Sequence, residues 1–290
     1  ILVWSGLVIG LAFGAVGQAT GFCLNRAVKD YVESKNLLKA RSFALALLVA
    51  IVGTQSLSSS EIINFSSAIY RAPNFSWVLL PVGATMFGYG MMLANGCGAR
   101  TVVLLAQGNL RSLVVLLCLG ISAYATLSGV LGPLRNMIAQ ATNIPLGGLY
   151  DLSLVTNQIT LGVLLAALCW FVFHRGEILR NAKELFGGLA VGLLVVAGWA
   201  ATGWLAADEF EPTPLVSLTF IAPIGETIQY AMIATGMRLG FPVALILGVL
   251  LGSFIVAALQ GTLRLQGFST PHEMRRYVLG GVMMGVGGAL

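Results

Sequence analysis

Residues 87–100 read FGYGMMLANGCGAR, and this stretch combines apolar residues typical of a membrane span with a cysteine that is a candidate functional residue. It starts as the end of an apolar segment and finishes with Cys97 between two glycines, with Arg100 three residues later. Much of the same pattern occurs 74 residues earlier, where Cys23 and Arg26 stand at the same spacing. Two cysteines placed alike at the ends of apolar segments predict a paired site.

The composition indicates a polytopic membrane protein. The chain has 290 residues, of which 57% are hydrophobic and 9% charged, and its mean hydropathy is +0.90. A soluble domain carries roughly 25% charged residues. The 36 glycines are typical of transmembrane helices that pack closely or break. The connecting segments are too short for a soluble domain, and no basic and aromatic cluster points to nucleic acid.

Apolar segments of the right length recur along the chain. A spanning helix needs about 20 mostly apolar residues. We therefore expect an all-α fold of about 8–9 transmembrane helices with short re-entrant helices. The predicted spans lie at 1–22, 41–57, 75–96, 110–129, 153–173, 185–206 and 241–260, with a last one that opens near residue 277.

The basic residues predict the orientation, because Lys and Arg concentrate in cytoplasmic loops. The basic loops 24–41 and 174–184 should lie inside, which places the N-terminus in the periplasm. The basic segment 261–276 should lie inside too, so only one crossing fits between it and the acidic outer loop. The apolar segment 215–236 is therefore predicted to dip into the membrane and return, with its turn at 223–225.

Glycine spacings indicate two related halves. Gly6 and Gly10 recur 182 residues later, and Gly83, Gly88 and Gly90 recur 197 residues later. The matched spans run in opposite directions, as in an inverted pseudo-two-fold repeat with its substrate site near the midplane. The alternative is a chance match between glycine-rich helices. The expected organisation is a single transmembrane domain at 1–290, with a first half at 1–130, a connecting segment with one span at 131–184 and a second half at 185–290.

The four cysteines fall into two groups. Cys118 and Cys169 lie inside apolar spans, where a thiol behaves as a small hydrophobe. Cys23 and Cys97 lie at span ends among small and polar residues, which makes them the functional candidates. There is no Cys-x-x-Cys pair, and the two histidines lie in different loops, so a zinc site is not expected. No haem or quinone ligand set is visible, and no cofactor is predicted.

The residues around Cys23 and Cys97 predict an anion site. Gly21 and Gly96 allow sharp turns, and the short helices that follow present free N–H groups and a positive dipole end. The two arginines add charge to the site or pair with lipid phosphate, and both readings stay open. Glu226 lines the path as a proton carrier or has a structural role at an interface. The predicted path residues are Cys23, Cys97, Gly21, Gly96, Gly98, Asn95, Arg26, Arg100, Thr20 and Glu226.

A neutral thiol is a weak, soft and polarisable donor, which suits a sulfur-bearing anion better than chloride or phosphate. The field of the same helix ends would also lower the pKa of a thiol and favour a reactive thiolate. Thiolate chemistry is therefore the competing interpretation. A thiolate would repel an anionic substrate, so a transporter should keep both thiols neutral.

Three motifs together resemble the YeeE/YedE sulfur-transport family, and the likeness covers essentially the whole chain. They are GFCLNR at 21–26, NGCGAR at 95–100 and GGVMMGVGGAL at 280–290. The resemblance implies a multi-pass protein of the bacterial inner membrane with inverted pseudo-symmetry. It also implies that Cys23 and Cys97 line a central path and pass thiosulfate along through S–H···S contacts without covalent chemistry. Other members are proposed to carry selenium or other sulfur compounds.

The resemblance carries two further expectations. The third cysteine of the family follows the terminal glycine run, which the 197-residue offset places at position 294, beyond the last residue of this sequence. A small soluble sulfur carrier of the TusA type is an expected partner at the cytoplasmic face. The leading hypothesis is an uptake transporter for thiosulfate rather than an enzyme. The alternatives are a membrane sulfurtransferase or thiol oxidoreductase with Cys97 as nucleophile, a carrier of another sulfur or selenium compound, and a passive channel.

Overall fold

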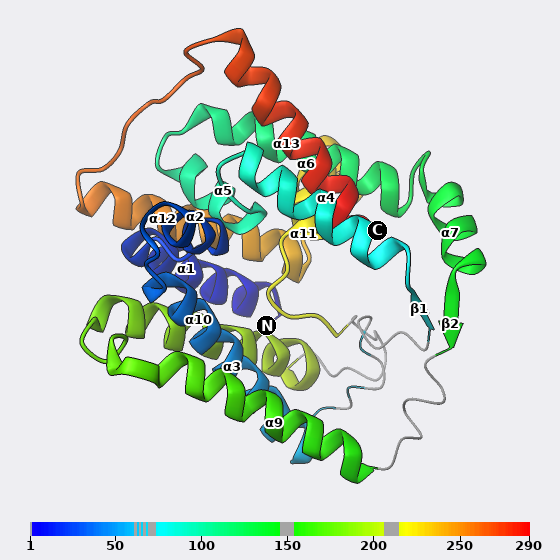
Figure 1. Cartoon of the computed structure of the whole chain (residues 1–290). Coiled ribbons are helices and arrows are strands. Elements are labelled where there is room, and N and C mark those ends of the chain that lie inside the picture. Colours follow the sequence, from blue (N-terminus) through cyan, green and yellow to red (C-terminus); the bar gives the residue numbers. More distant parts are fainter. Residues whose placement is uncertain are drawn as a thin grey trace.

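The computed structural model is built almost entirely of helices (Figure 1). It describes residues 2–60, 63, 65, 68, 74–145, 154–205 and 215–290. The helices are α1 (Leu2–Thr20), α2 (Leu24–Ser34), α3 (Leu38–Ser59), α4 (Leu79–Leu93), α5 (Gly98–Ala106), α6 (Leu110–Leu127), α7 (Gly132–Ala141), α9 (Leu154–Phe173), α10 (Ala182–Ala200), α11 (Ile221–Ile233), α12 (Phe241–Leu259) and α13 (Pro271–Ala289).

Three short elements complete the described chain. A 3₁₀ turn, η2 (His174–Gly176), follows α9, and a π-helical turn, η3 (Ala201–Leu205), extends α10. The strands β1 (Asn74–Ser76) and β2 (Asn143–Pro145) form one small antiparallel pair. The all-α prediction is confirmed, because these two three-residue strands are the only sheet in the described ranges.

Five helical stretches in the described part of the chain are long and apolar enough to cross a membrane. A sixth apolar stretch, Ile159–Phe173, is shorter, and α4 has 15 residues. The chain is thus a multi-pass membrane protein by the length and composition of its helices. The five long stretches are Leu2–Ser34, Leu38–Ser59, Leu110–Leu127, Ala182–Trp204 and Phe241–Leu259.

The last helix begins earlier than predicted. The sequence placed its start near residue 277, whereas α13 begins at Pro271. Thr270 caps it, since its side chain accepts a hydrogen bond of 3.2 Å from the backbone N–H of Glu273. Pro271 adds a fixed φ at the first helical position, where no N–H is needed. Arg275 and Arg276 therefore lie on a helix and not in a loop.

The predicted turning point in segment 215–236 is wrong. Residues 215–220 are irregular, and α11 begins directly afterwards at Ile221. Pro223 lies in the first turn of this helix, where a missing N–H breaks no hydrogen bond. The chain is thus irregular before Ile221 and runs through Pro223 as helix. That this segment dips and returns stays a prediction.

Glycines let two pairs of long helices approach backbone to backbone. Helix α1 packs on α12, and a Cβ on Gly6 would lie 2.9 Å from the carbonyl oxygen of Phe241. Helix α10 packs on α3, and a Cβ on Gly188 would lie 2.6 Å from the carbonyl oxygen of Ser42. Gly6 and Gly188 are matched positions of the sequence repeat. Each therefore lies against a carbonyl of a different partner helix, in the manner typical of close helix crossings in membranes.

Helices α4 and α13 cross through a reciprocal set of glycines. A Cβ on Gly83 would lie 2.6 Å from the carbonyl oxygen of Gly287, and a Cβ on Gly287 would lie 2.6 Å from that of Gly83. Gly90 and Gly280 face each other in the same way, at 2.7 and 2.8 Å. Because residue numbers rise on one helix as they fall on the other, the two helices run antiparallel. No side chain fits along this line.

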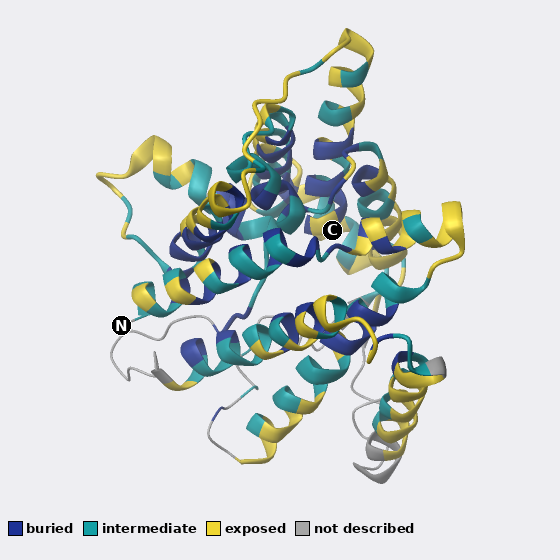
Figure 2. Cartoon of the chain, turned by 90° about the vertical axis from the view of Figure 1, so that its left-hand side faces the viewer, coloured by how far each residue is buried: buried dark blue, intermediate teal, exposed yellow. Residues whose placement is uncertain are grey.

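The main buried cluster joins the short helix α5 to the long helices around it. Val102 of α5 packs in one cluster with Phe13 of α1, Leu119 of α6 and Val249 of α12. Figure 2 shows buried segments gathered in the middle of the bundle and exposed ones at helix ends and on the outer faces. The beginning of α5, where Cys97 stands, is therefore held inside the protein.

Candidate functional site

The structure brings the two candidate cysteines together. Their Sγ atoms lie 3.9 Å apart, within hydrogen-bond distance for sulfur, and either thiol can be the donor. Cys23 is buried, Cys97 is half-buried, and both are free thiols. The residues are 74 positions apart in sequence, so the contact joins the α1–α2 turn to the α4–α5 turn. A pair of thiols with one shared hydrogen bond has a second hydrogen left to donate elsewhere.

Each cysteine stands at the start of a helix. Cys23 is the N-cap of α2 and Cys97 is the N-cap of α5, and neither side chain caps its helix by a hydrogen bond. The carbonyl of Cys23 accepts the first helical bond from Ala27, and that of Cys97 accepts one from Thr101. The first N–H groups of both helices are thus without helical partners, and both positive helix ends lie next to the thiols.

The turn before Cys23 depends on Gly21 and Thr20. Gly21 has φ +70°, a left-handed conformation that favours glycine. A side chain at this position would also collide with the guanidinium of Arg26. The Thr20 hydroxyl donates to the carbonyl of Val16 at 2.7 Å and accepts from the N–H of Phe22 at 3.2 Å. Both predicted residues therefore shape the turn, and the hydroxyl of Thr20 is already engaged there.

The turn before Cys97 differs from the sequence expectation. The left-handed residue is Asn95, with φ +55°, and not Gly96, which we expected to supply the turn. Asn is one of the few residues with a side chain that adopts this conformation readily. Gly96 closes the end of α4 by donating its N–H to the carbonyl of Met91 at 3.1 Å. A Cβ on Gly98 would make only ordinary contacts, the nearest being 3.5 Å from Ile224 Cδ1.

The two arginines lie at the C-terminal end of α1. Arg100 Nη1 donates to the carbonyl of Gly17 at 3.1 Å, and the guanidinium of Arg26 covers Gly21. Helix C-termini carry partial negative charge, so these contacts stabilise both cations in place. Arg26 and both cysteines lie within electrostatic range of Arg100. The guanidinium groups are therefore anchored close to the thiols.

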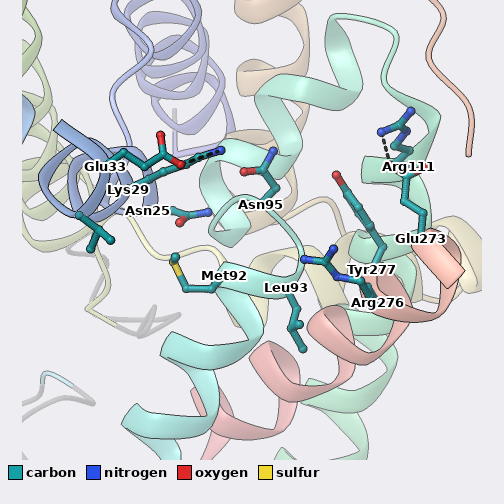
Figure 3. A pocket seen from close by; sticks show the side chains of 11 residues that line it. Asn25, Lys29, Glu33, Met92, Leu93, Asn95, Arg111, Glu273, Arg276 and Tyr277 are labelled. Carbon is teal, nitrogen blue, oxygen red and sulfur yellow. Dashed lines mark hydrogen bonds and ion pairs between the residues drawn. The ribbon is translucent and has the colours of Figure 1, made fainter. Parts of the chain in front are cut away.

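Two adjoining cavities open beside this cluster, and we call them together the basic vestibule. The first has a volume of about 480 Å³ and the second about 360 Å³. Lys29, Glu33 and Asn95 line both and form the wall between them. Figure 3 shows the first cavity. The acidic lining residues are Asp30, Glu33 and Glu273, and the basic ones are Arg26, Lys29, Lys39, Arg100, Arg111 and Arg276.

Asn25 lines the first cavity and was missed as a site residue by the sequence reasoning. It is 3% exposed, and its Nδ2 donates to the carbonyl of Met91 at 3.0 Å, which ties α2 to the end of α4. Its Oδ1 is buried without a partner in the part of the chain that the structure describes. A buried acceptor of this kind is usually satisfied by water. An amide inside the motif GFCLNR, at the end of an apolar span, was the available signal.

Glu226 lies apart from the thiol pair. Ile224 approaches Gly98, and a residue two positions later on a helix points to roughly the opposite side. There the carboxyl group of Glu226 lies near the side chain of Tyr124 of α6. Glu226 lines neither cavity of the basic vestibule. Among the described residues, no group of three His, Cys, Asp or Glu side chains is arranged to hold a metal ion.

Comparison with known proteins places this architecture in a family. The sulphur transport family matches residues 19–290. The thiosulfate transporter TsuA of Escherichia coli is 27% identical over 319 residues, covering 100% of this chain and 84% of that protein. The thiosulfate transporter TsuA of Spirochaeta thermophila is 25% identical over 312 residues, covering 99% of this chain and 87% of that protein. The family match includes both cysteine turns and the helices α2 and α5 that follow them, and the chain belongs to the sulphur transport family.

Proposed function

We propose that the chain is an uptake transporter for thiosulfate in a bacterial inner membrane. The observation that carries the proposal is the Cys23–Cys97 contact of 3.9 Å between the positive ends of α2 and α5. Family membership supports sulfur transport, and the two relatives named above are both thiosulfate transporters. The thiols act as soft donors that hold the anion briefly, and no covalent bond forms.

The donor set suits an anion with both sulfur and oxygen ends. A thiol that is not donating to its neighbour can donate to a terminal sulfur, while backbone N–H groups and guanidinium groups donate to oxygens. Both thiols must be neutral for this, because a thiolate beside a dianion is repelled. A hydrogen bond between the two sulfurs is consistent with at least one protonated thiol.

The helix contacts support the proposed inverted repeat of residues 1–130 and 185–290. In such a repeat, α1 corresponds to α10, α12 to α3 and α4 to α13. The α1–α12 contact therefore corresponds to the α10–α3 contact, and the α4–α13 crossing corresponds to itself. The glycine contacts described above follow this scheme. We further propose about 8–9 transmembrane helices. This number counts α4, α9 and α13 as membrane spans in addition to the five long stretches.

The orientation follows from the charges. The basic vestibule is lined by residues of α2 and of the beginning of α13, so it faces the cytoplasm by the positive-inside rule, and the N-terminus is periplasmic. A small soluble sulfur carrier would meet the protein on this face.

The proposal is tested by uptake of radiolabelled thiosulfate into proteoliposomes. We expect Cys97→Ser and Cys23→Ser each to lower initial uptake by about tenfold or more, equivalent to about 1.4 kcal/mol of lost interaction. Cys118→Ser and Cys169→Ser are matched controls, because these cysteines lie within α6 and α9 and not at the starts of α2 and α5, and they should leave uptake unchanged. Wild-type uptake by both Cys23→Ser and Cys97→Ser would refute the proposed role of the thiols.

Two alternatives give different results in the same preparation. A sulfurtransferase with Cys97 as nucleophile would carry a persulfide after exposure to thiosulfate, visible as one added sulfur in the mass of the cysteine peptide. A carrier of another sulfur or selenium compound would take up sulfite or selenite faster than thiosulfate when each is supplied alone.

A further inference from the structure

The first cavity of the basic vestibule has a set of polar groups that the thiol site does not use. Neither cysteine lines this cavity. It lies between α2, the α4–α5 turn and the beginning of α13, and Arg276, Tyr277 and Asn95 are among the lining side chains drawn in Figure 3. The volume of about 480 Å³ is ample for one small hydrated anion.

Most charges around this cavity are paired. Arg111 forms an ion pair with Glu273, and Lys29 lies 3.8 Å from Glu33. Arg276 has no ion pair or hydrogen bond among the described residues. Among the described residues, Arg276 is therefore the guanidinium of this cavity that lies outside ion-pair distance of every carboxylate, including Glu273 one helical turn earlier.

Tyr277 and Asn95 add neutral donors on two sides of Arg276. The ring of Tyr277 packs edge-on against Phe268, with ring centroids 5.7 Å apart, which fixes the direction of its hydroxyl. Asn95 is exposed and lines both cavities, so its amide lies at the wall between them. A guanidinium, a hydroxyl and an amide are the donors with which proteins bind oxyanions.

We propose that this cavity is a second anion site, in which Arg276, Tyr277 and Asn95 hold the oxygens of one small sulfur oxyanion beside the thiol pair. The site rests on the proposed function, because it would hold the same anion on the vestibule side of the cysteines. Its donors are hard and none contains sulfur, so it accepts sulfate as readily as thiosulfate. The thiol pair prefers thiosulfate. Conduction through several weak sites is the general way in which an ion enters and also leaves a path.

Equilibrium binding to the purified full chain tests the proposal, with radiolabelled sulfate as the probe. The variants are Arg276→Gln and, as the matched control, Arg275→Gln, because Arg275 is also exposed and lines neither cavity. We expect Arg276→Gln to weaken sulfate binding by about tenfold or more and Arg275→Gln to leave it unchanged. Arg276→Lys, which keeps the charge but loses the planar fork, should fall between them.

A variant that lacks both cysteines of the thiol pair separates this proposal from the proposed function. In protein that carries both Cys23→Ser and Cys97→Ser, sulfate binding should persist with wild-type affinity, because the cysteines do not line the cavity. Equal sulfate binding by Arg276→Gln and Arg275→Gln, in samples that elute as single species on size exclusion, would overturn the second site. That outcome leaves the thiosulfate uptake result of the cysteine variants intact, so the two proposals fail independently.

Discussion

Replacement of Gly90 by alanine tests whether the α4–α13 crossing holds the bundle together. The new Cβ would lie 2.7 Å from the carbonyl oxygen of Gly280 and 2.8 Å from the backbone nitrogen of Met284. Ordinary contact begins at 3.4 Å, so the helices would have to separate by about 0.7 Å along this line. Both opposing atoms belong to backbone, which cannot rotate away. Overpacking of this kind costs about 1–3 kcal/mol.

Gly88→Ala is the control on the same helix. A Cβ on Gly88 meets no atom within 4 Å, so alanine creates no clash there. Alanine is also a better helix former than glycine by up to about 1 kcal/mol. Purified protein in detergent, melted while its exposed thiols are followed with a reactive dye, gives an apparent Tm for each variant. One kcal/mol shifts Tm by about 2–4 °C in domains of 150–250 residues, so Gly90→Ala should melt several degrees below Gly88→Ala.

The reciprocal geometry sharpens this experiment. A Cβ on Gly287 would lie 2.6 Å from both the carbonyl oxygen of Gly83 and the backbone nitrogen of Phe87. Gly287 is the counterpart of Gly90 in the proposed repeat, so Gly287→Ala should lower Tm by a similar amount. If Gly90→Ala melts at or above the temperature of Gly88→Ala, the close α4–α13 contact described above is incorrect.

Three further changes probe the surroundings of the site. Glu273→Gln removes the ion pair with Arg111, and because both side chains are partly exposed it should cost under about 1 kcal/mol, seen as a small, salt-dependent drop in Tm. Asn25→Ala removes the hydrogen bond from the Asn25 amide to the carbonyl of Met91, which still accepts from the N–H of Gly96, and should cost about 0.5–1.5 kcal/mol, seen as a drop in Tm that salt does not reduce. Glu226→Gln removes the ionisable group beside Tyr124 and keeps its size, and because Glu226 lines neither cavity of the vestibule the pH profile of uptake should match that of the wild type; a flattened profile would indicate that Glu226 carries protons.

The helices and the cysteine pairing were accessible from sequence because each depends on a long-range regularity. Apolar length predicts a spanning helix whatever its neighbours are. The shared spacing of Cys23 and Cys97 from their arginines indicated equivalent roles before any contact was known. The structure adds that the two turns meet and that their sulfurs lie 3.9 Å apart, which no spacing rule could provide.

The predictions that were wrong concern helix boundaries and turns, whose positions depend on a few local interactions. The start of α13 was missed because Arg275 and Arg276 were counted as loop charges, although Thr270, Pro271 and Glu273 form a recognisable start signal. Pro223 was read as a turning point, yet a proline in the first turn of a helix removes no hydrogen bond.

The turn before Cys97 and the vestibule show a different limit. Gly96 was expected to allow the sharp turn there, whereas the left-handed residue of the turn is Asn95 and Gly96 has no positive φ. The vestibule residues come from α2, α3, α4, the α4–α5 turn, α5, α6 and α13, and their grouping depends on packing between distant helices. Charge counts along the chain predicted a basic face but not which of its cations is left unpaired.

The proposed arrangement of donors gives a physical reason for two sites of different chemistry. Guanidinium, hydroxyl and amide groups attract any small oxyanion, so a path built of them alone would pass sulfate, which has the same charge and nearly the same shape as thiosulfate. Thiols alone would favour the sulfur end of thiosulfate but supply little attraction for a dianion, because a neutral thiol is a weak donor. With the basic vestibule beside the Cys23–Cys97 pair, attraction and selection are separated. The cations and helix ends raise the local concentration of anions, and the thiols discriminate between them by sulfur contact alone. Selectivity for thiosulfate over sulfate should therefore fall in the cysteine variants and remain intact in Arg276→Gln, even where both reduce uptake.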